Sequence, residues 1–70
     1  MKPLTAKQVE KILLRHGFKL VRQKGSHIVM QQQIPGSTVT AIVPDHAELR
    51  TGTLLSIVRQ SRLPRELFEV

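Results

Sequence analysis

The sequence predicts an α+β fold in which two helices pack on one face of a three-stranded antiparallel sheet. Three observations support this fold class. An amphipathic helical pattern occupies residues 6–16, three alternating apolar and polar segments follow it, and a second helical pattern lies in the C-terminal third. The expected order is therefore α-β-β-β-α, and the 70 residues are expected to form a single domain, 1–70.

The first helix carries start and stop signals at both ends. Thr5 is the expected N-cap, and Gln8 stands three residues later, as in a capping box. Gly17 follows the last apolar position and suits a left-handed cap. Basic residues recur every fourth position and are expected to line one solvent-facing side: Lys7, Lys11 and Arg15.

The three strands are expected at residues 18–23, 27–32 and 38–43, separated by Lys24-Gly25-Ser26 and Pro35-Gly36. A three-residue turn at 24–26 pairs Leu20 with Met30 and Gln23 with His27. A two-residue turn would mix the apolar and polar faces, so the register favours three residues.

Alternation then assigns a face to each strand residue. The face toward the helices is expected to hold Phe18, Leu20, Ile28, Met30, Val39, Ala41 and Val43. The opposite face, expected to stay open, holds Lys19, Val21, Gln23, His27, Val29, Gln31, Thr38, Thr40 and Ile42.

The C-terminal third begins where Pro44 ends the last strand. Residues 45–50 are expected to form a loop, and Thr51-Gly52-Thr53 to open the second helix. Pro64 follows that helix and is expected to start a short final helical turn. The inward residues of the second helix are expected to be Leu54, Ile57 and Val58.

The net charge of +6 lies entirely in residues 1–24, because residues 25–70 carry as many acidic as basic side chains. Such asymmetry favours a face that binds a polyanion, although a solvated run of charges has the same composition. Only two aromatic side chains are present, so binding should rest on phosphate and sugar contacts rather than on base stacking.

Composition also bears on the cellular environment that can be expected for this protein. No cysteine is present, which excludes disulfides and is compatible with a reducing, cytoplasmic environment. No apolar run approaches the roughly 20 residues of a membrane helix, and the first residues lack the apolar segment of a signal peptide. No membrane association is therefore expected.

His27 is the main candidate for chemistry, because imidazole exchanges protons at neutral pH. RNA is cleaved without metal when a base takes the proton of the 2′-hydroxyl, which then attacks the neighbouring phosphate. Such proton transfer contributes about 10²–10⁴-fold. Nearby cations would neutralise the phosphorane: Lys19, Arg22 and Lys24. A surface histidine without a role is the alternative.

Other sites find less support in the sequence. Ser26 and His27 are adjacent on a strand and point to opposite faces, so they do not form a nucleophilic pair. His16, His27 and His46 lack ligand spacing, so no metal or other cofactor is expected. The stretch 50–53 opens a helix and could bind phosphate there or simply cap the helix.

Motifs spread along the chain give it a resemblance to the HicA toxins of bacterial toxin–antitoxin systems. They are Leu13 to Gly17-Phe18, Arg22 to His27, Pro44-Asp45-His46, Gly52-Thr53-Leu54 with Ile57-Val58-Arg59-Gln60, and Leu67-Phe68. The resemblance implies a double-stranded-RNA-binding-domain-like fold and mRNA interferase activity. It also implies that His27 is the catalytic histidine, that Gly25 is the family's glycine, and that a HicB antitoxin blocks the toxin.

One position departs from the family pattern. Many members have a second histidine directly after the first, where this chain has Ile28. By alternation Ile28 faces the core, so the change leaves His27 in place but removes any help from a second imidazole.

Sequence and resemblance together predict an RNA-cleaving toxin with His27 as general acid/base. The residues expected to bind RNA are Lys7, Lys11, Arg15, Lys19, Arg22, Lys24 and Gly25. The expected partners are mRNA and a HicB-like antitoxin. A non-catalytic double-stranded-RNA-binding module and a structural protein of a ribonucleoprotein are the two alternatives.

Overall fold

The computed structural model describes residues 2–69 and has the predicted α-β-β-β-α order. A 3-10 helix, η1, follows the second helix, as the sequence around Pro64 predicts. The elements are α1 (Ala6–Arg15), β1 (Lys19–Lys24), β2 (His27–Ile34), β3 (Ser37–Pro44), α2 (Thr51–Ser61) and η1 (Arg65–Phe68).

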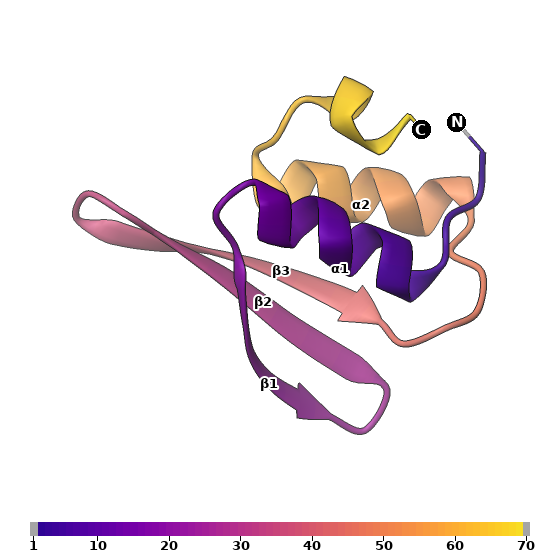
Figure 1. Cartoon of the computed structure of the whole chain (residues 1–70), viewed down its shortest axis with the longest axis horizontal. Helices are drawn as coiled ribbons and strands as arrows, with labels where there is room; N and C mark the ends of the chain where they lie inside the picture. The colour runs from indigo at the N-terminus through magenta and orange to yellow at the C-terminus, as the bar shows by residue number, and fades with distance from the viewer. Residues whose placement is uncertain (1, 70) are drawn as a thin grey trace.

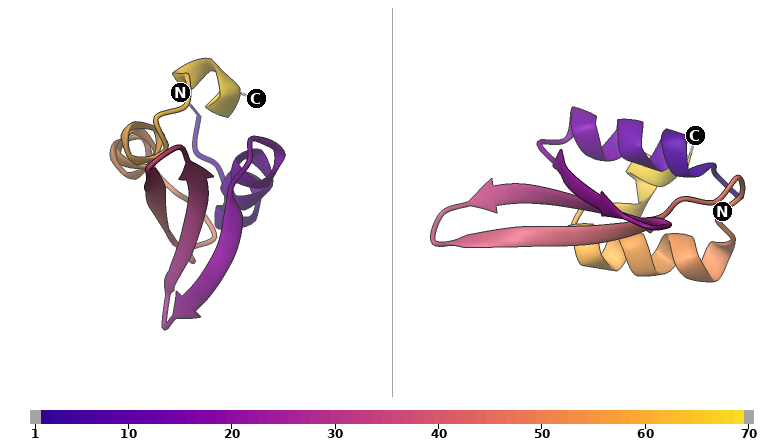
Figure 2. Two further views of the ribbon diagram at one scale, coloured as in Figure 1. Left: turned by 90° about the vertical axis from the view of Figure 1, so that its left-hand side faces the viewer. Right: turned by 90° about the horizontal axis from the view of Figure 1, so that it is seen from below.

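The three strands form one antiparallel sheet in the order β1-β2-β3. Both α1 and α2 lie on the same face of this sheet, as Figure 1 and the two views in Figure 2 show. We call the opposite face the open face, because no helix within residues 2–69 covers it. The tip of the β2–β3 hairpin projects beyond the helices.

The hydrophobic core lies between the helices and the sheet. Phe18 and Phe68, the two aromatic residues, are both buried in it. The strands contribute Ile28, Met30, Val39, Ala41 and Val43, and the helices contribute Ala6, Val9, Ile12, Leu13, Leu54 and Ile57. The predicted inward face is confirmed at these strand positions and at Leu54 and Ile57, while Val58 is only partly buried.

Two burial predictions on the sheet are wrong. Leu20 was expected in the core, but it lies on the outer strand β1, beyond the cover of the helices, and is 49% exposed. Val29 was expected on an open surface, but it lies on the central strand between Arg22 and Ile42, and only 7% of it is exposed. Position within the sheet decides both cases.

The ends of α1 follow their sequence signals. The Thr5 hydroxyl accepts a hydrogen bond from Gln8 N at 3.1 Å, and the Gln8 side chain accepts one from Thr5 N at 2.8 Å. This capping box satisfies two backbone donors that a helix start otherwise leaves unpaired. At the other end Gly17 adopts φ +94° and the chain turns into β1.

The first hairpin differs from its prediction. Lys24 pairs with His27, so the turn contains only Gly25 and Ser26. The pairing then shifts between Leu20 and Arg22, which leaves Val21 as a β-bulge, and Leu20 pairs with Met30 as expected. The bulge supplies the extra residue that the prediction had assigned to the turn.

The two edges of the sheet are not alike. At the β3 edge the backbone N–H of Ile42 donates to the Gln60 side chain of α2 at 2.8 Å. At the other edge, all six residues of β1 are exposed. The sheet is therefore partly covered along β3 and open along β1.

Candidate functional site

His27 is the first residue of β2 and is exposed on the open face. It stands between two strand partners, Lys24 on β1 and Pro44 on β3. Residues directly opposite each other in an antiparallel pair have Cβ atoms about 5 Å apart. The Lys24 and His27 side chains therefore start from neighbouring points on one surface.

The bulge at Val21 determines which cations accompany His27. With unbroken alternation along β1, Arg22 would share the helix-side face with Leu20. In the structure, Arg22 pairs with Val29 and Lys19 pairs with Gln31, and both partners share the face of His27. Lys19, Arg22 and Lys24 thus line β1 on the open face, and we call them the β1 cations.

The turn beside His27 is held to the loop that follows β3. Ser26 O accepts a hydrogen bond from Asp45 N at 2.6 Å. The Gln23 side-chain amide donates to Asp45 Oδ2 at 3.1 Å and to Gly25 O at 3.2 Å. Gly25 itself has φ +59° and open space where a Cβ would stand. The turn is anchored, yet its outer surface stays accessible.

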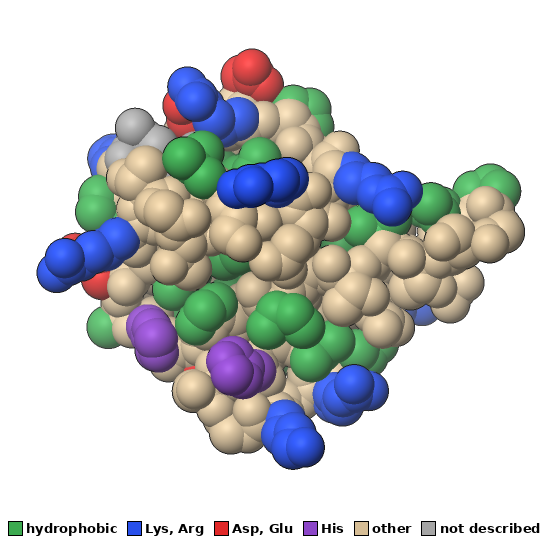
Figure 3. Space-filling view, turned by 180° about the vertical axis from the view of Figure 1, so that it is seen from behind, with side chains coloured by type: hydrophobic (Ala, Val, Ile, Leu, Met, Phe, Trp, Pro, Cys, Tyr) green, Lys and Arg blue, Asp and Glu red, His purple; other side chains and the backbone are tan. Residues whose placement is uncertain are grey.

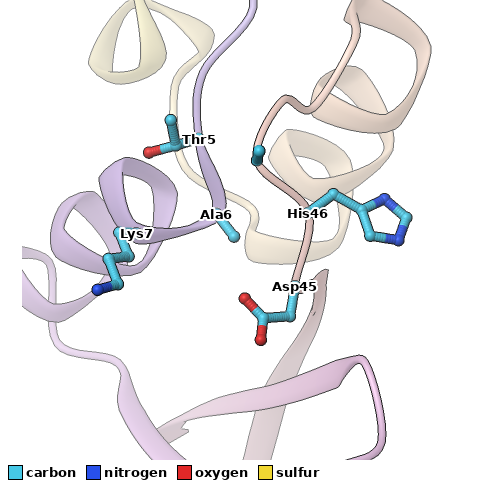
Figure 4. Close-up of a pocket in the computed structure, with 6 residues that line it drawn as sticks. Thr5, Ala6, Lys7, Asp45 and His46 are labelled. Carbon is cyan, nitrogen blue, oxygen red and sulfur yellow. The ribbon is translucent and has the colours of Figure 1, made fainter.

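A hollow lies where the loop after β3 meets the start of α1 (Figure 4). It is lined by Thr5, Ala6, Lys7, Asp45, His46 and Ala47. The Asp45 carboxylate points into it, whereas the His46 imidazole points away. The backbone of His46 fixes the loop, because His46 O accepts a hydrogen bond from Ala6 N at 3.2 Å.

The cations of α1 form a separate group. The helix buries Ala6, Val9, Ile12 and Leu13, and its periodicity places the basic residues on the opposite, solvent-facing side. Lys7 also lines the hollow beside Asp45. Lys11 and Arg15 lie farther along the helix and point away from the sheet, so the structure does not bring them together with His27.

Figure 3 shows how histidine, basic and hydrophobic side chains are distributed on the molecular surface, seen from behind. Histidine side chains lie next to Lys or Arg side chains, at the end of the molecule away from the projecting hairpin. Hydrophobic side chains lie beside them on the same surface. The site is therefore a shallow, cationic surface, which suits an extended ligand better than a small enclosed one.

Sequence reasoning missed the parts that hold this site together. Neither the Gln23–Asp45 hydrogen bond nor the Ser26–Asp45 backbone link has a local signature, because each joins residues about 20 positions apart in the chain. The two-residue turn did have a signal, since Gly-Ser between alternating segments favours a short hairpin.

Three further structural features concern metal ligands, the start of α2 and membrane spans. Among residues 2–69, no group of three or more His, Cys, Asp or Glu side chains is placed to hold a metal ion. At the start of α2 the N-cap is Arg50, whose side chain makes no capping hydrogen bond. No helix in the described part of the chain is long and apolar enough to cross a membrane.

Comparison with known proteins assigns the family. A comparison with individually curated proteins finds none that matches the chain. The family model described as HicA toxin of bacterial toxin–antitoxin matches residues 6–63, which span α1 through the end of α2 and include the turn, His27 and all three β1 cations. The chain therefore belongs to the HicA toxin family of bacterial toxin–antitoxin systems.

Proposed function

We propose that this HicA toxin is a metal-independent endoribonuclease that cleaves mRNA, with His27 as its general acid/base. One observation carries the proposal: the exposed His27 stands directly opposite Lys24, on a face that also presents Arg22 and Lys19. A proton-transfer group beside fixed cations is what cleavage of a phosphodiester requires.

The reaction uses the 2′-hydroxyl of the RNA itself. His27 accepts the hydroxyl proton while the 2′-oxygen bonds to phosphorus. The bond from phosphorus to the 5′-oxygen breaks, and that oxygen takes a proton from solvent. Lys24 and Arg22 stabilise the negative charge that collects on the phosphorane oxygens.

Ile28 is compatible with this mechanism. It is only 3% exposed and pairs with Gln23 and Val43 on the helix-side face of the sheet. A side chain at this position points into the core and does not share the surface of His27. The proposal therefore assigns the removal of the 2′-hydroxyl proton to His27 alone, with no second imidazole.

The partner in a toxin–antitoxin system is an antitoxin, and we propose that a HicB-like protein fills this role. Because the toxin carries a net charge of +6, complementary charge on the antitoxin would speed association. Hydrogen exchange of the complex should show protection over residues 19–31, with loss of RNA cleavage. Binding that leaves this segment unprotected and RNA still cut would contradict the inhibition model.

The catalytic assignment is tested by His27→Ala and His27→Gln, with His16→Ala as the matched control at an exposed histidine on the other side of the fold. Cleavage of a labelled RNA should fall about 100-fold or more in both His27 variants. It should remain unchanged in the control. Circular dichroism would establish that all three variants keep the fold.

Two experiments on the wild-type protein test the mechanism, one with a modified RNA and one with a metal chelator. A 2′-O-methyl group at the cut site should block cleavage, and EDTA should not. Normal cleavage of the methylated RNA would identify water as the attacking group. If His27→Ala cleaved RNA at the wild-type rate, the catalytic hypothesis for His27 would be overturned. The rival function, a double-stranded-RNA-binding module, would then be favoured.

A further inference from the structure

A second hollow lies on the sheet, at the end of β1 away from His27. It has a volume of about 290 Å³ and is lined by Gly17, Lys19, Val21, Gln31, Gln32 and Gln33. The hollow exists because β2 is longer than its neighbour: residues 32–34 pair with β3 but have no partner in β1. The chain enters the sheet at this point from the α1–β1 turn.

The polar lining of this hollow can form new hydrogen bonds. Gln33 is exposed, and its side-chain amide makes no hydrogen bond to any other residue between 2 and 69. The Gln31 amide donates to Thr40 Oγ1 at 3.3 Å, which orients the side chain and leaves its Oε1 atom as an acceptor. Both residues alternate in step with His27 and so lie on the open face.

Two other lining residues, Val21 and Lys19, suit the other parts of a nucleotide. Val21, the bulge residue, is 46% exposed and offers an apolar surface to a base ring. Lys19 supplies a cation for the adjoining phosphate and continues the row formed by Arg22 and Lys24. With no exposed aromatic side chain available, apolar contact and amide hydrogen bonds replace stacking.

We propose that this hollow is a nucleobase subsite of the RNA-binding face and that it prefers adenine. A glutamine amide pairs with adenine in a bidentate way, because its oxygen accepts from N6 and its nitrogen donates to N7. Gln33 is assigned as the base reader, and Gln31 supports it. This inference rests on the proposed function, since it takes RNA to be the ligand.

Geometry fixes where the subsite acts along the RNA. Gln31 and Gln33 lie four and six residues from His27 on β2, which corresponds to about 13 and 20 Å. The base in the hollow is therefore several nucleotides away from the bond that His27 cleaves. Preference for adenine should appear at one fixed position distant from the cut.

Binding is tested without relying on cleavage. Wild-type chain is titrated with 2′-O-methyl oligonucleotides that carry each of the four bases at one varied position, and the side-chain amide signals of Gln31 and Gln33 are followed by NMR. The adenine oligonucleotide should bind about 10-fold more tightly and shift both signals. Gln33→Ala should remove this preference, and Glu66→Gln, on η1, should retain it.

Cleavage assays then separate the two proposals. Equal binding of all four oligonucleotides, with no effect of Gln33→Ala, would overturn the subsite even if His27-dependent cleavage is found. Adenine-selective binding without any cleavage would support the subsite and refute the catalytic proposal. Protection of the hollow by an antitoxin, but by none of the oligonucleotides, would assign it to protein binding and overturn the subsite.

Discussion

At the residue scale, Gly17 and Gly25 both adopt a positive φ, but their surroundings differ. Gly25 has φ +59° and open space around the position of a Cβ. Gly17 has φ +94°, and a Cβ there would collide with the side-chain amide of Gln32. A β-carbon is therefore tolerated better in the turn beside His27 than at the end of α1.

We expect Gly17→Ala to destabilise the fold by about 2 kcal/mol, mainly because a residue with a Cβ is strained at φ +94°, while the flexible end of the Gln32 side chain must also move aside. Gly25→Ala should cost about 1 kcal/mol, from strain alone. In a domain of this size 1 kcal/mol shifts the Tm by about 4–8 °C. Thermal unfolding of both variants checks this ranking, and an equal or larger loss in Gly25→Ala would contradict it.

At the scale of single elements, the bulge in β1 determines which of its side chains share the face of His27. Val21 is the only residue of β1 without a cross-strand partner. Its deletion should preserve every pair in the β1–β2 ladder. Deletion of Gln23 should instead let the bulge close, so that Val21 pairs with Val29 and Arg22 moves to the helix-side face opposite Ile28.

These two single-residue deletions are matched in length and differ in their consequence. Cross-strand NOEs should connect Arg22 with Val29 in the Val21 deletion, and with Ile28 in the Gln23 deletion. RNA cleavage should be lower in the Gln23 deletion, by about 10-fold, because a cation leaves the surface of His27 and the Gln23–Asp45 hydrogen bond that anchors the turn is lost. Equal cleavage by both would show that Arg22 does not act there.

A comparison of α1 with β1 shows which features the sequence could predict and which it could not. The helix boundaries were predictable because Thr5, Gln8 and Gly17 act on their immediate neighbours. The face of Arg22 was not, since alternation assumes an unbroken ladder and a one-residue bulge has no local signature. The face of His27 was predicted correctly, because β2 itself contains no irregularity. Its partner on β1 was not, since His27 pairs with Lys24 and Gln23 pairs with Ile28 on the helix-side face.

At the scale of the whole molecule, the excess positive charge is divided between two surfaces. One set lies on the outer side of α1, and the other, the β1 cations, lies on the open face with His27. Under the proposed function, an RNA strand at the open face would contact the second set directly. The first set would contribute mainly through its long-range field.

Alanine substitution of either set tests this division. Removal of the β1 cations should lower both RNA affinity and the cleavage rate at saturating RNA. Removal of the β1 cations should also flatten the plot of the logarithm of the RNA-binding constant against the logarithm of salt concentration. On a single strand, the slope should fall by about 0.7 for each lost phosphate contact. Removal of Lys7, Lys11 and Arg15 should lower affinity alone. A rate loss from the α1 set at saturation would contradict the division.

The exposed edge of β1 has a consequence for the solution behaviour of this protein. An uncovered strand edge is a template for pairing with another chain, and charged side chains and bulges are the usual obstacles to such aggregation. Here Lys19, Arg22, Lys24 and the bulge at Val21 supply both obstacles. The residues assigned to RNA should thus also oppose edge-to-edge pairing of free toxin molecules. Variants that neutralise them should self-associate more readily through this edge, unless an antitoxin covers the strand.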